Sequence, residues 1–250
     1  MAMKNKVTLR AIPLLELPGK MLGERGSLRL LESAQCDPWW LYTHILSGGY
    51  NKPFIIEDDR TRRLHFNLCA VQSSMRIDDP YTLDFAYTRK MMAFLLFMPD
   101  PGHVLMVGLG GGSLAKFCHR YLPRARLTVI EVNADVIALR GEFNIPDDER
   151  LAIIHADAAD YLPACEGDTD VLLLDGFDIA GIAPTFLNHA FYQAAHRRLR
   201  SGGILVANFA GPMEDWQNHF VLLNEVFDGR VHLGRVSGGD NHIAFAFADA

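Results

Sequence analysis

VLMVGLGGGSLAKFCHRYLPRARLTVIE, residues 104–131, is the stretch of sequence that decides how this chain folds. Its first four residues are apolar and end at Gly108, a pattern typical of a strand buried on both faces of a parallel sheet. The turn that follows is rich in glycines, which let main-chain N–H groups approach a ligand closely: Gly108, Gly110, Gly111 and Gly112. Ser113 is placed to cap the helix that the pattern predicts next.

A second apolar run, Leu127 to Ile130, ends in Glu131 about twenty residues after the glycine turn. In nucleotide-binding folds, a carboxylate at this place accepts hydrogen bonds from the two hydroxyls of a ribose. The combination therefore predicts a site for a nucleotide-type cofactor. A plain strand, turn and helix with an incidental acid at Glu131 is the alternative.

Composition narrows the classes of function. The 250 residues are 49% apolar, which is enough for a sizeable core, and the formal net charge is −6. Lys and Arg are scattered along the chain, so no nucleic-acid partner is expected. The histidines, among them His155, His189 and His196, show no metal-ligand spacing, so no metal site is predicted.

The cysteines and the N-terminus indicate a soluble, cytoplasmic protein. Cys36, Cys69, Cys118 and Cys165 lie far apart without a C-x-x-C pair, which is typical of reduced thiols. No secretory leader is recognised, and no uninterrupted apolar run is long enough to span a bilayer. We therefore expect no association with a membrane.

Residues 1–80 are expected to form a small β-rich region. Short alternating runs lie between turn-forming residues, at positions 27–32, 54–57 and 63–67. EDDRTRR, residues 57–63, resembles a hairpin connection. Trp39 and Trp40 are expected to pack against other side chains rather than to bind a ligand.

Residues 81–250 are expected to form the cofactor-binding domain. Apolar residues recur at helical spacing from Thr82 to Phe97. Beyond Glu131, helices and strands alternate, which calls for a parallel, doubly wound sheet, with a turn at residues 201–203. The closing runs RVHLGRV and HIAFAFA leave no room for a helix between them and are expected to pair as an antiparallel edge.

The residues just after each strand indicate which cofactor such a sheet binds, because they form its binding crevice. A dinucleotide site requires Gly or Ala at the third position of G-x-G-x-x-G, and here that position is Ser113. Asp157, after the strand LAIIH, can accept a hydrogen bond from the exocyclic amine of adenine. Two carboxylates and a glycine turn therefore predict an S-adenosylmethionine-type site. The alternative for Asp157 is a helix N-cap, which does not exclude binding.

DGFD, residues 175–178, follows the strand VLLL and supplies two further acids. A positively charged sulfonium favours nearby carboxylates. An amine must be neutral to displace at carbon, so Asp175 is a candidate to hold an attacking amine and accept its proton. Two solvated acids in a capped loop are the alternative.

In order as well as in type, these residues resemble those of the spermidine synthases, the polyamine aminopropyltransferases. The resemblance runs from Leu64 to Phe209. The strand, glutamine and helix ahead of the family's glycine turn are similar to LHFNLCAVQSSMRIDDPYTLDFAYTRKMM. The family's ribose-binding strand end is similar to VIEVN, its adenine-binding segment to HADAADYL, and its D-x-x-D loop to DGFD. The resemblance implies the fold of the class I S-adenosylmethionine-dependent methyltransferases, which is a Rossmann-like, doubly wound sheet, here with an antiparallel C-terminal edge. It also implies a homodimer.

The resemblance also assigns roles to individual residues. It implies that Gln72 contacts the thioether and ribose side of the cofactor, Glu131 the ribose hydroxyls and Asp157 the adenine. It makes Asp175 the general base and Asp178 a second anchor for the amine.

Several positions depart from the family's pattern. Gly111 stands where the family's glycine turn carries an aspartate that holds the amine of the aminopropyl arm. Tyr87, which would flank the substrate channel, is followed by Thr88 and Arg89 instead of a pair that ends in glutamate. Ile179 replaces a proline, and SGGDNH replaces a Thr-Tyr-Pro-like substrate loop. We expect Arg89 to disfavour a polycationic amine, and Gly111 to leave room for the carboxylate of intact S-adenosylmethionine.

Two functions are consistent with these residues. The first is a spermidine synthase-like transferase that uses S-adenosylmethionine or its decarboxylated form to alkylate a small molecule, an amine, with Asp175 as general base. Whether methyl or aminopropyl is transferred stays open. The alternative is a cofactor-binding protein of the same fold that has lost catalysis. Ser113 and Asp157 argue against a third class, a nicotinamide-dependent oxidoreductase.

Overall fold

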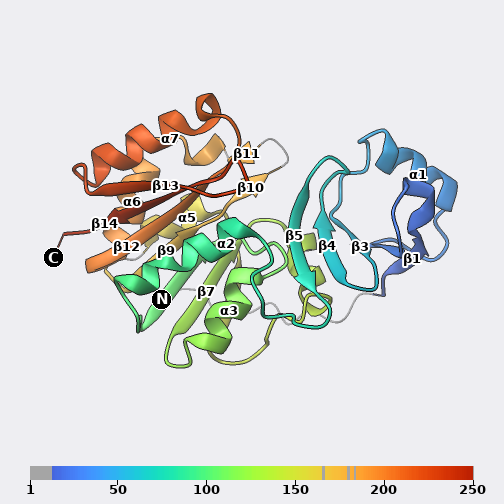
Figure 1. Ribbon diagram of the computed structural model, residues 1–250, viewed down its shortest axis with the longest axis horizontal. Helices are drawn as coiled ribbons and strands as arrows, with labels where there is room; N and C mark the ends of the chain where they lie inside the picture. The colour runs from blue at the N-terminus through green and yellow to red at the C-terminus, as the bar shows by residue number, and fades with distance from the viewer. Residues whose placement is uncertain (1–12, 165–166, 179–180, 183, 250) are drawn as a thin grey trace.

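The computed structural model describes residues 13–164, 167–178, 181–182 and 184–249. Figure 1 shows two sheets side by side: a five-stranded antiparallel sheet from the N-terminal part of the chain, and a larger mixed sheet from the rest. Cys165 and Ile179, singled out in the sequence, lie outside the described ranges. None of the helices within these ranges is long and apolar enough to cross a membrane.

The N-terminal sheet pairs each strand with the next along the chain. Its elements are β1 (Leu15–Pro18), η1 (Gly19–Leu22), β2 (Ser27–Leu30), α1 (Pro38–Leu46), β3 (Phe54–Glu57), β4 (Thr61–His65) and β5 (Val71–Arg76). The predicted hairpin at residues 57–63 is confirmed, because β3 and β4 pair antiparallel across it. The Asp58 carboxylate closes this turn by accepting hydrogen bonds from the N–H groups of Arg60 at 2.8 Å and Thr61 at 2.7 Å.

Trp39 and Trp40 are 67% and 50% exposed on α1, and they pack only against rings of the same helix, Trp39 against Tyr42 and Trp40 against His44. Helix α1 turns Leu41, Tyr42 and Ile45 into the core of the N-terminal sheet. The helical period of 3.6 residues then places both tryptophans on the opposite side of the helix, toward solvent.

The mixed sheet has the strand order β13-β14-β12-β9-β6-β7-β8. Its strands are β6 (His103–Val107), β7 (Arg126–Glu131), β8 (Leu151–His155), β9 (Thr169–Leu174), β12 (Leu199–Phe209), β13 (Val231–Arg235) and β14 (His242–Phe247). Strands β8, β7, β6, β9 and β12 are parallel, while β14 pairs antiparallel with both β12 and β13. The predicted antiparallel closing edge is therefore confirmed. A short ladder, β10 (Phe177–Asp178) with β11 (Gly181–Ile182), lies outside this sheet.

Helices cover both faces of the mixed sheet (Figure 1). They are α2 (Ala86–Met91), η2 (Met92–Leu96), α3 (Ser113–Tyr121), α4 (Ala134–Ala138), η3 (Leu139–Gly141), α5 (Ala158–Tyr161), η4 (Leu162–Ala164), η5 (Pro184–Phe186), α6 (His189–Arg198) and α7 (Met213–Val226). Successive strand residues point to opposite faces. Val104 and Met106 of β6 therefore join the core under α2, α3 and α4, whereas Leu105 and Val107 join the core under α5, α6 and α7.

Two predicted elements differ from the structure. The helix expected from Thr82 begins at Ala86 and continues as a 3₁₀ turn, because Thr82 is held in a preceding turn by Asp79. The prediction of a turn at residues 201–203 is wrong, since these residues lie inside β12. The pairing of β12 with β9 shifts register between Leu199 and Ile204. A bulge in one long strand takes the place of that turn.

The N-terminal sheet is fastened directly to the mixed-sheet core. Arg29 donates to a Glu142 carboxylate oxygen at 2.8 Å, and Arg62 donates to the main-chain oxygen of the same residue. Leu64 and Met75 belong to the same apolar cluster as the residues of α3. Strand β5 is thereby held beside the start of α3, next to the glycine turn.

Candidate active site

The glycine turn and Asp175 meet at the point where the order of the strands reverses. Strands β6 and β9 are neighbours, with Val107 opposite Leu174, but the chain builds β7 and β8 on the other side of β6 before it returns to β9. The loops after β6 and β9 therefore diverge and leave a crevice. Gly108 has φ of +94°, and a Cβ there would lie 2.3 Å from the Asp175 carbonyl oxygen, so only glycine fits.

A cavity of about 720 Å³ opens at this crevice. Most of the site residues predicted from the sequence line it: Gln72, Tyr87, Gly108, Gly110, Glu131, Asp157 and Asp175. Gly112 is not in the lining, because it lies against Ile145, 2.4 Å from where a Cβ would stand. Asp178 falls in β10, and its side chain lies outside the described part of the structure.

The start of α3 differs from the prediction. Ser113 does not cap this helix: the N-cap is Gly112, with φ of +68°, and no side chain caps the first turn. The Ser113 hydroxyl instead lines the cavity, with its Oγ 3.4 Å from the Oγ of Ser73 on β5. N–H groups at the first turn of a helix that no side chain caps can donate hydrogen bonds to a polar ligand group.

Glu131 connects the end of β7 to the glycine turn. Its carboxylate accepts hydrogen bonds from the N–H groups of Leu109 and Asn133, each at 2.8 Å, and its side chain is buried. Burial raises the pKa of Glu131, and the hydrogen bonds from Asn133 and Leu109 oppose this shift. The carboxylate is held in one orientation at the cavity wall.

Asp157 both caps a helix and lines the cavity. Its side chain accepts a hydrogen bond from the N–H of Ala159 at 2.8 Å at the start of α5. The capping alternative raised by the sequence is therefore correct, and it coexists with exposure of Asp157 to the cavity.

Asp175 is the end point of a chain of hydrogen bonds. Its Oδ1 accepts from the Asn208 amide at 2.8 Å, and the Tyr87 hydroxyl lies 3.4 Å from its Oδ2. The Asn241 amide donates in turn to the Asn208 side-chain oxygen at 2.9 Å. Burial raises the pKa of Asp175 to about 6, while the hydrogen bonds from Asn208 and Tyr87 act in the opposite direction.

Sequence reasoning missed Asn208 and Asn241. The signal for Asn208 is a polar residue inside the otherwise apolar strand ILVANF, where an unpartnered amide would be costly. Asn241 lies in the loop between β13 and β14 and carries no local signal.

The charged side chains that line the cavity are all acidic. Within the described ranges they are Glu131, Asp157, Asp175 and Asp215, and neither Lys, Arg nor His contributes to the lining. Asp215, also missed from the sequence, lies exposed in the first turn of α7, with its Oδ2 beside Gly211. A lining of this kind attracts cations and disfavours anions.

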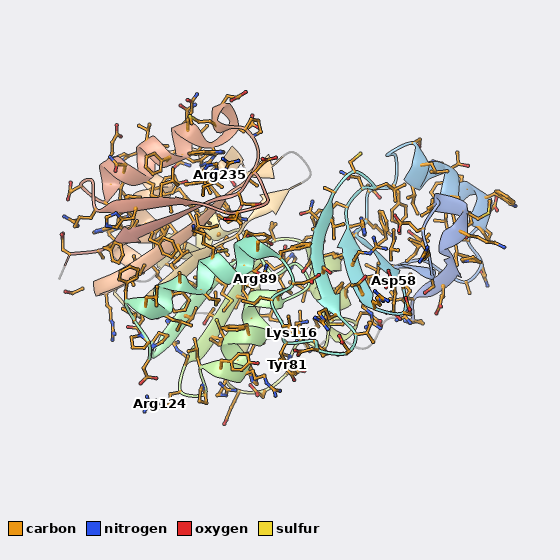
Figure 2. All side chains as sticks on the ribbon, viewed as in Figure 1. Asp58, Tyr81, Arg89, Lys116, Arg124 and Arg235 are labelled. Atoms are coloured by element: carbon orange, nitrogen blue, oxygen red, sulfur yellow. The ribbon has the colours of Figure 1, made fainter. Side chains whose placement is uncertain are left out.

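Arg89 does not contribute a positive charge to the cavity, so the expectation from the sequence is wrong. Its side chain is exposed on α2 and is labelled in Figure 2. One guanidinium nitrogen donates to the main-chain oxygens of Leu83 at 2.6 Å and Asp84 at 2.7 Å. These bonds hold Arg89 at the N-terminal end of α2, away from the lining.

Gly111 does not leave an empty space, so this expectation is wrong too. A Cβ at Gly111 would lie 2.6 Å from the Ser73 hydroxyl and 2.9 Å from the Phe143 ring. The segment with Phe143 is anchored by Lys116 (Figure 2), whose buried ammonium donates to the Phe143 carbonyl oxygen at 2.9 Å. Burial lowers the pKa of Lys116 to about 8.

Known proteins resemble this chain both in sequence and in architecture. The spermine/spermidine synthase domain matches residues 84–224. A polyamine aminopropyltransferase of Chromobacterium violaceum is 40% identical over 179 residues, 71% of this chain and 69% of the relative. The crystal structure of a probable spermidine synthase from Corynebacterium glutamicum has a TM-score of 0.67 at 26% identity, covering 78% of this chain and 77% of that one.

A methyltransferase shares the fold as well. Human methyltransferase-like protein 13, solved in complex with SAH, has a TM-score of 0.59 at 23% identity, covering 66% of this chain and 82% of that one, a likeness that shows the fold alone. The predicted methyltransferase-like, Rossmann-like fold is therefore confirmed, and so is the resemblance drawn from the motifs. With a domain match over more than half of its length and a relative at 40% identity, this chain belongs to the spermine/spermidine synthase family of transferases.

Proposed function

We propose that this chain transfers the aminopropyl group of decarboxylated S-adenosylmethionine to a small cationic amine. The observation that carries the proposal is the cavity at the strand-order reversal, whose described charged lining is four carboxylates without a cation. Both reactants are positively charged, the donor at its sulfonium and its amine, the acceptor at its amines. An acidic, partly enclosed cavity concentrates such molecules and orients them.

The adenosine part of the donor fits the glycine-turn side of the cavity. The Glu131 carboxylate would accept hydrogen bonds from the ribose hydroxyls, and Asp157 from the adenine amine. Gln72 on β5 would contact the thioether side. Gly108 and Gly110, with φ of +94° and +51°, keep the wall free of side chains where the donor approaches.

The decarboxylated donor fits this lining better than the intact one. Intact S-adenosylmethionine would bring a further carboxylate toward Glu131, Asp157 and Asp175, and no described lining residue offers a compensating positive charge. Gly111 also provides no extra volume, because Ser73 and Phe143 occupy the space beside it. These observations favour aminopropyl transfer over methyl transfer.

The bound donor supplies an electrophilic carbon, where the acceptor nitrogen forms a C–N bond as the C–S bond breaks and methylthioadenosine leaves. Asp175 would hold the attacking amine and accept its proton. A pKa of about 6 leaves this carboxylate mostly ionised near pH 7.5 and able to act as a base. The hydrogen bonds from Asn208 and Tyr87 fix its orientation, which favours a working transferase over a protein that binds the donor without turnover.

The proposal is tested by calorimetry and by product analysis. We expect the purified protein to bind decarboxylated S-adenosylmethionine and methylthioadenosine, with S-adenosylmethionine at least about tenfold weaker. With a panel of aliphatic diamines, mass spectrometry should detect addition of an aminopropyl group and release of methylthioadenosine. Tight binding of the intact donor together with methylated products would contradict the proposal, and failure to bind any of the three compounds would overturn it.

The exposed carboxylate of Asp215 is expected to anchor the distal ammonium of a diamine acceptor. Within the described ranges it has neither a hydrogen bond nor an ion pair through its side chain, and it opens on the same cavity as Asp175. Asp215→Asn should therefore raise the KM for a diamine about fivefold at low salt, the size of an exposed charge pair, with little change in kcat.

The acceptor panel gives this prediction its controls. The KM for a monoamine of equal length should stay the same in Asp215→Asn, because such an acceptor has no distal charge. Glu214→Gln, which removes the neighbouring exposed acid outside the lining, should behave like the unsubstituted protein. Equal effects of Asp215→Asn on monoamine and diamine would show that Asp215 does not act on the distal charge.

A further inference from the structure

Asn241 reaches the proposed base through a single intermediary. It lies in the loop between β13 and β14, lines the cavity and donates its amide to the Asn208 side-chain oxygen at 2.9 Å. Asn208, at the end of β12, is 5% exposed and donates its own amide to Asp175 Oδ1 at 2.8 Å. Three segments that are distant in the sequence thus form one directional series of hydrogen bonds.

The direction of this series depends on both hydrogen-bond partners of Asn208, which are Asn241 and Asp175. A side-chain amide presents a donor on one side and an acceptor on the other, and either orientation of Asn208 fills the same space. The Asn241 amide donates to the Asn208 oxygen, and the Asp175 carboxylate accepts from the Asn208 N–H, so both partners favour the orientation in which the Asn208 oxygen faces Asn241 and its N–H faces Asp175. The reversed orientation would place an amide oxygen against the Asp175 carboxylate, which is repulsive.

Few other groups support the ionised form of Asp175. Tyr87 on α2 approaches it at 3.4 Å, and the remaining ionisable groups in the described lining are the carboxylates of Glu131 on β7, Asp157 after β8 and Asp215 on α7. These three disfavour a further negative charge in the cavity. The Asn208 hydrogen bond is therefore the strongest support that the described lining offers to the Asp175 carboxylate.

We propose that Asn241 is a positioning residue for catalysis: its hydrogen bond helps to hold the amide of Asn208 so that an N–H donor, and not an oxygen, faces the carboxylate of Asp175. The inference rests on the proposed role of Asp175 as the general base. It assigns a function to the SGGDN turn, which sequence comparison marks only as the place of a missing substrate loop. This turn acts on the base through Asn208.

The test is the pH dependence of kcat/KM for Asn241→Ala and Asn241→Asp. Without the Asn241 donor, Asn208 loses one of the two hydrogen bonds that hold its orientation, so the acid limb of the profile should move to higher pH by about half to one unit in Asn241→Ala. At high pH, where Asp175 is ionised in any case, the rate should return to within about threefold of that of the unsubstituted protein. A purely structural defect would lower the rate at every pH.

Asn241→Asp extends the test, because it keeps the shape, replaces the donor by an acceptor and adds a negative charge to the cavity that Asp175 lines. It favours the reversed Asn208 amide and should shift the limb further than Asn241→Ala does. Asp240→Asn alters the same loop outside the lining and should leave the profile unchanged. Asn241→Gln retains the donor and should restore part of the shift.

A second readout separates this inference from the proposed function. The Asp175 carboxyl can be titrated by carbon-13 NMR, with its signal assigned from its disappearance in Asp175→Asn. The pKa measured in this way should rise in Asn241→Ala and more in Asn241→Asp, whether or not a productive acceptor has been found. Absence of turnover in the unsubstituted protein would count against the proposed function alone. Unchanged titration of Asp175 in both variants would overturn the role of Asn241.

Discussion

Asp175→Asn is expected to lower kcat about a thousandfold while methylthioadenosine affinity stays within about twofold. The asparagine keeps the shape of the side chain but cannot take the proton of the attacking amine. Because Asp175 must be ionised to act, kcat/KM of the unsubstituted protein should fall as the pH is lowered through about 6. The measurements are steady-state kinetics across pH and calorimetry with methylthioadenosine.

The matched control for this substitution is Asp160→Asn. Asp160 is an exposed acid in the first turn of α5 and lies outside the cavity lining, so it reports the effect of removing one negative charge elsewhere. Its turnover should equal that of the unsubstituted protein. If Asp175→Asn retained more than about a tenth of the turnover, another group would have to be the base.

The same substitution should stabilise the fold at neutral pH. Burial raises the pKa of Asp175 to about 6, above the value of about 3.9 in an unfolded chain. The folded state therefore binds more protons between these values, and its stability falls as the pH rises from about 4 to about 6. Removing the charge should add about 1 kcal/mol to the free energy of unfolding at pH 7.5, because the carboxylate is only half-buried. Denaturant unfolding at pH 4 and pH 7.5 measures the difference.

Gly111→Asp, which introduces the family's aspartate into the glycine turn, is expected to lower both the stability of this protein and its affinity for the donor. The new Cβ would overlap the Ser73 hydroxyl at 2.6 Å and the Phe143 ring at 2.9 Å. Overpacking of this kind costs about 1–3 kcal/mol, and displacement of the turn should weaken donor binding at least about tenfold. Denaturant unfolding and calorimetry measure the two losses.

Two further variants test the cause of this damage. Gly141→Asp introduces the same side chain at a glycine where a Cβ meets nothing within 4 Å, and it should leave stability nearly unchanged. Combining Gly111→Asp with Ser73→Gly and Phe143→Ala removes both obstacles, so its effect should differ strongly from the sum of the single substitutions. A stable Gly111→Asp protein with tighter donor binding would instead mean that the family's amine anchor can be restored without repacking.

Local sequence patterns predicted the parts of the site that depend on one strand and the turn after it. The buried run of β6, the glycines after it, and the acids Glu131, Asp157 and Asp175 at successive strand ends could all be read in this way. The reason is physical: parallel strands place their carboxyl ends at one edge of a sheet, and a reversal of strand order opens a crevice there. The antiparallel closing edge followed from the short connection between its strands.

Tertiary structure alone decided what each of these residues faces. From the sequence, Gly111 suggests free volume beside the glycine turn, but Ser73 and Phe143, from two distant segments, occupy this volume. Arg89 reads as a cation in the site, yet its guanidinium binds the carbonyl oxygens of its own segment. Contacts of this kind depend on side-chain direction and long-range packing, to which a local pattern is blind.

The support of Asp175 shows the same division. Its place after β9 followed from the sequence, whereas the amides of Asn208 and Asn241 reach it only because β12 and the β13–β14 loop fold against the end of β9. Trp39 and Trp40 show the limit of residue type as a guide to burial. Their large aromatic side chains suggest burial, but Leu41, Tyr42 and Ile45 take the buried side of α1 and leave both tryptophans exposed. The sequence by itself determined the fold and the acids of the site, because both follow from strand periodicity and topology. The charge and the volume of the cavity were decided by side chains that only the folded chain brings together.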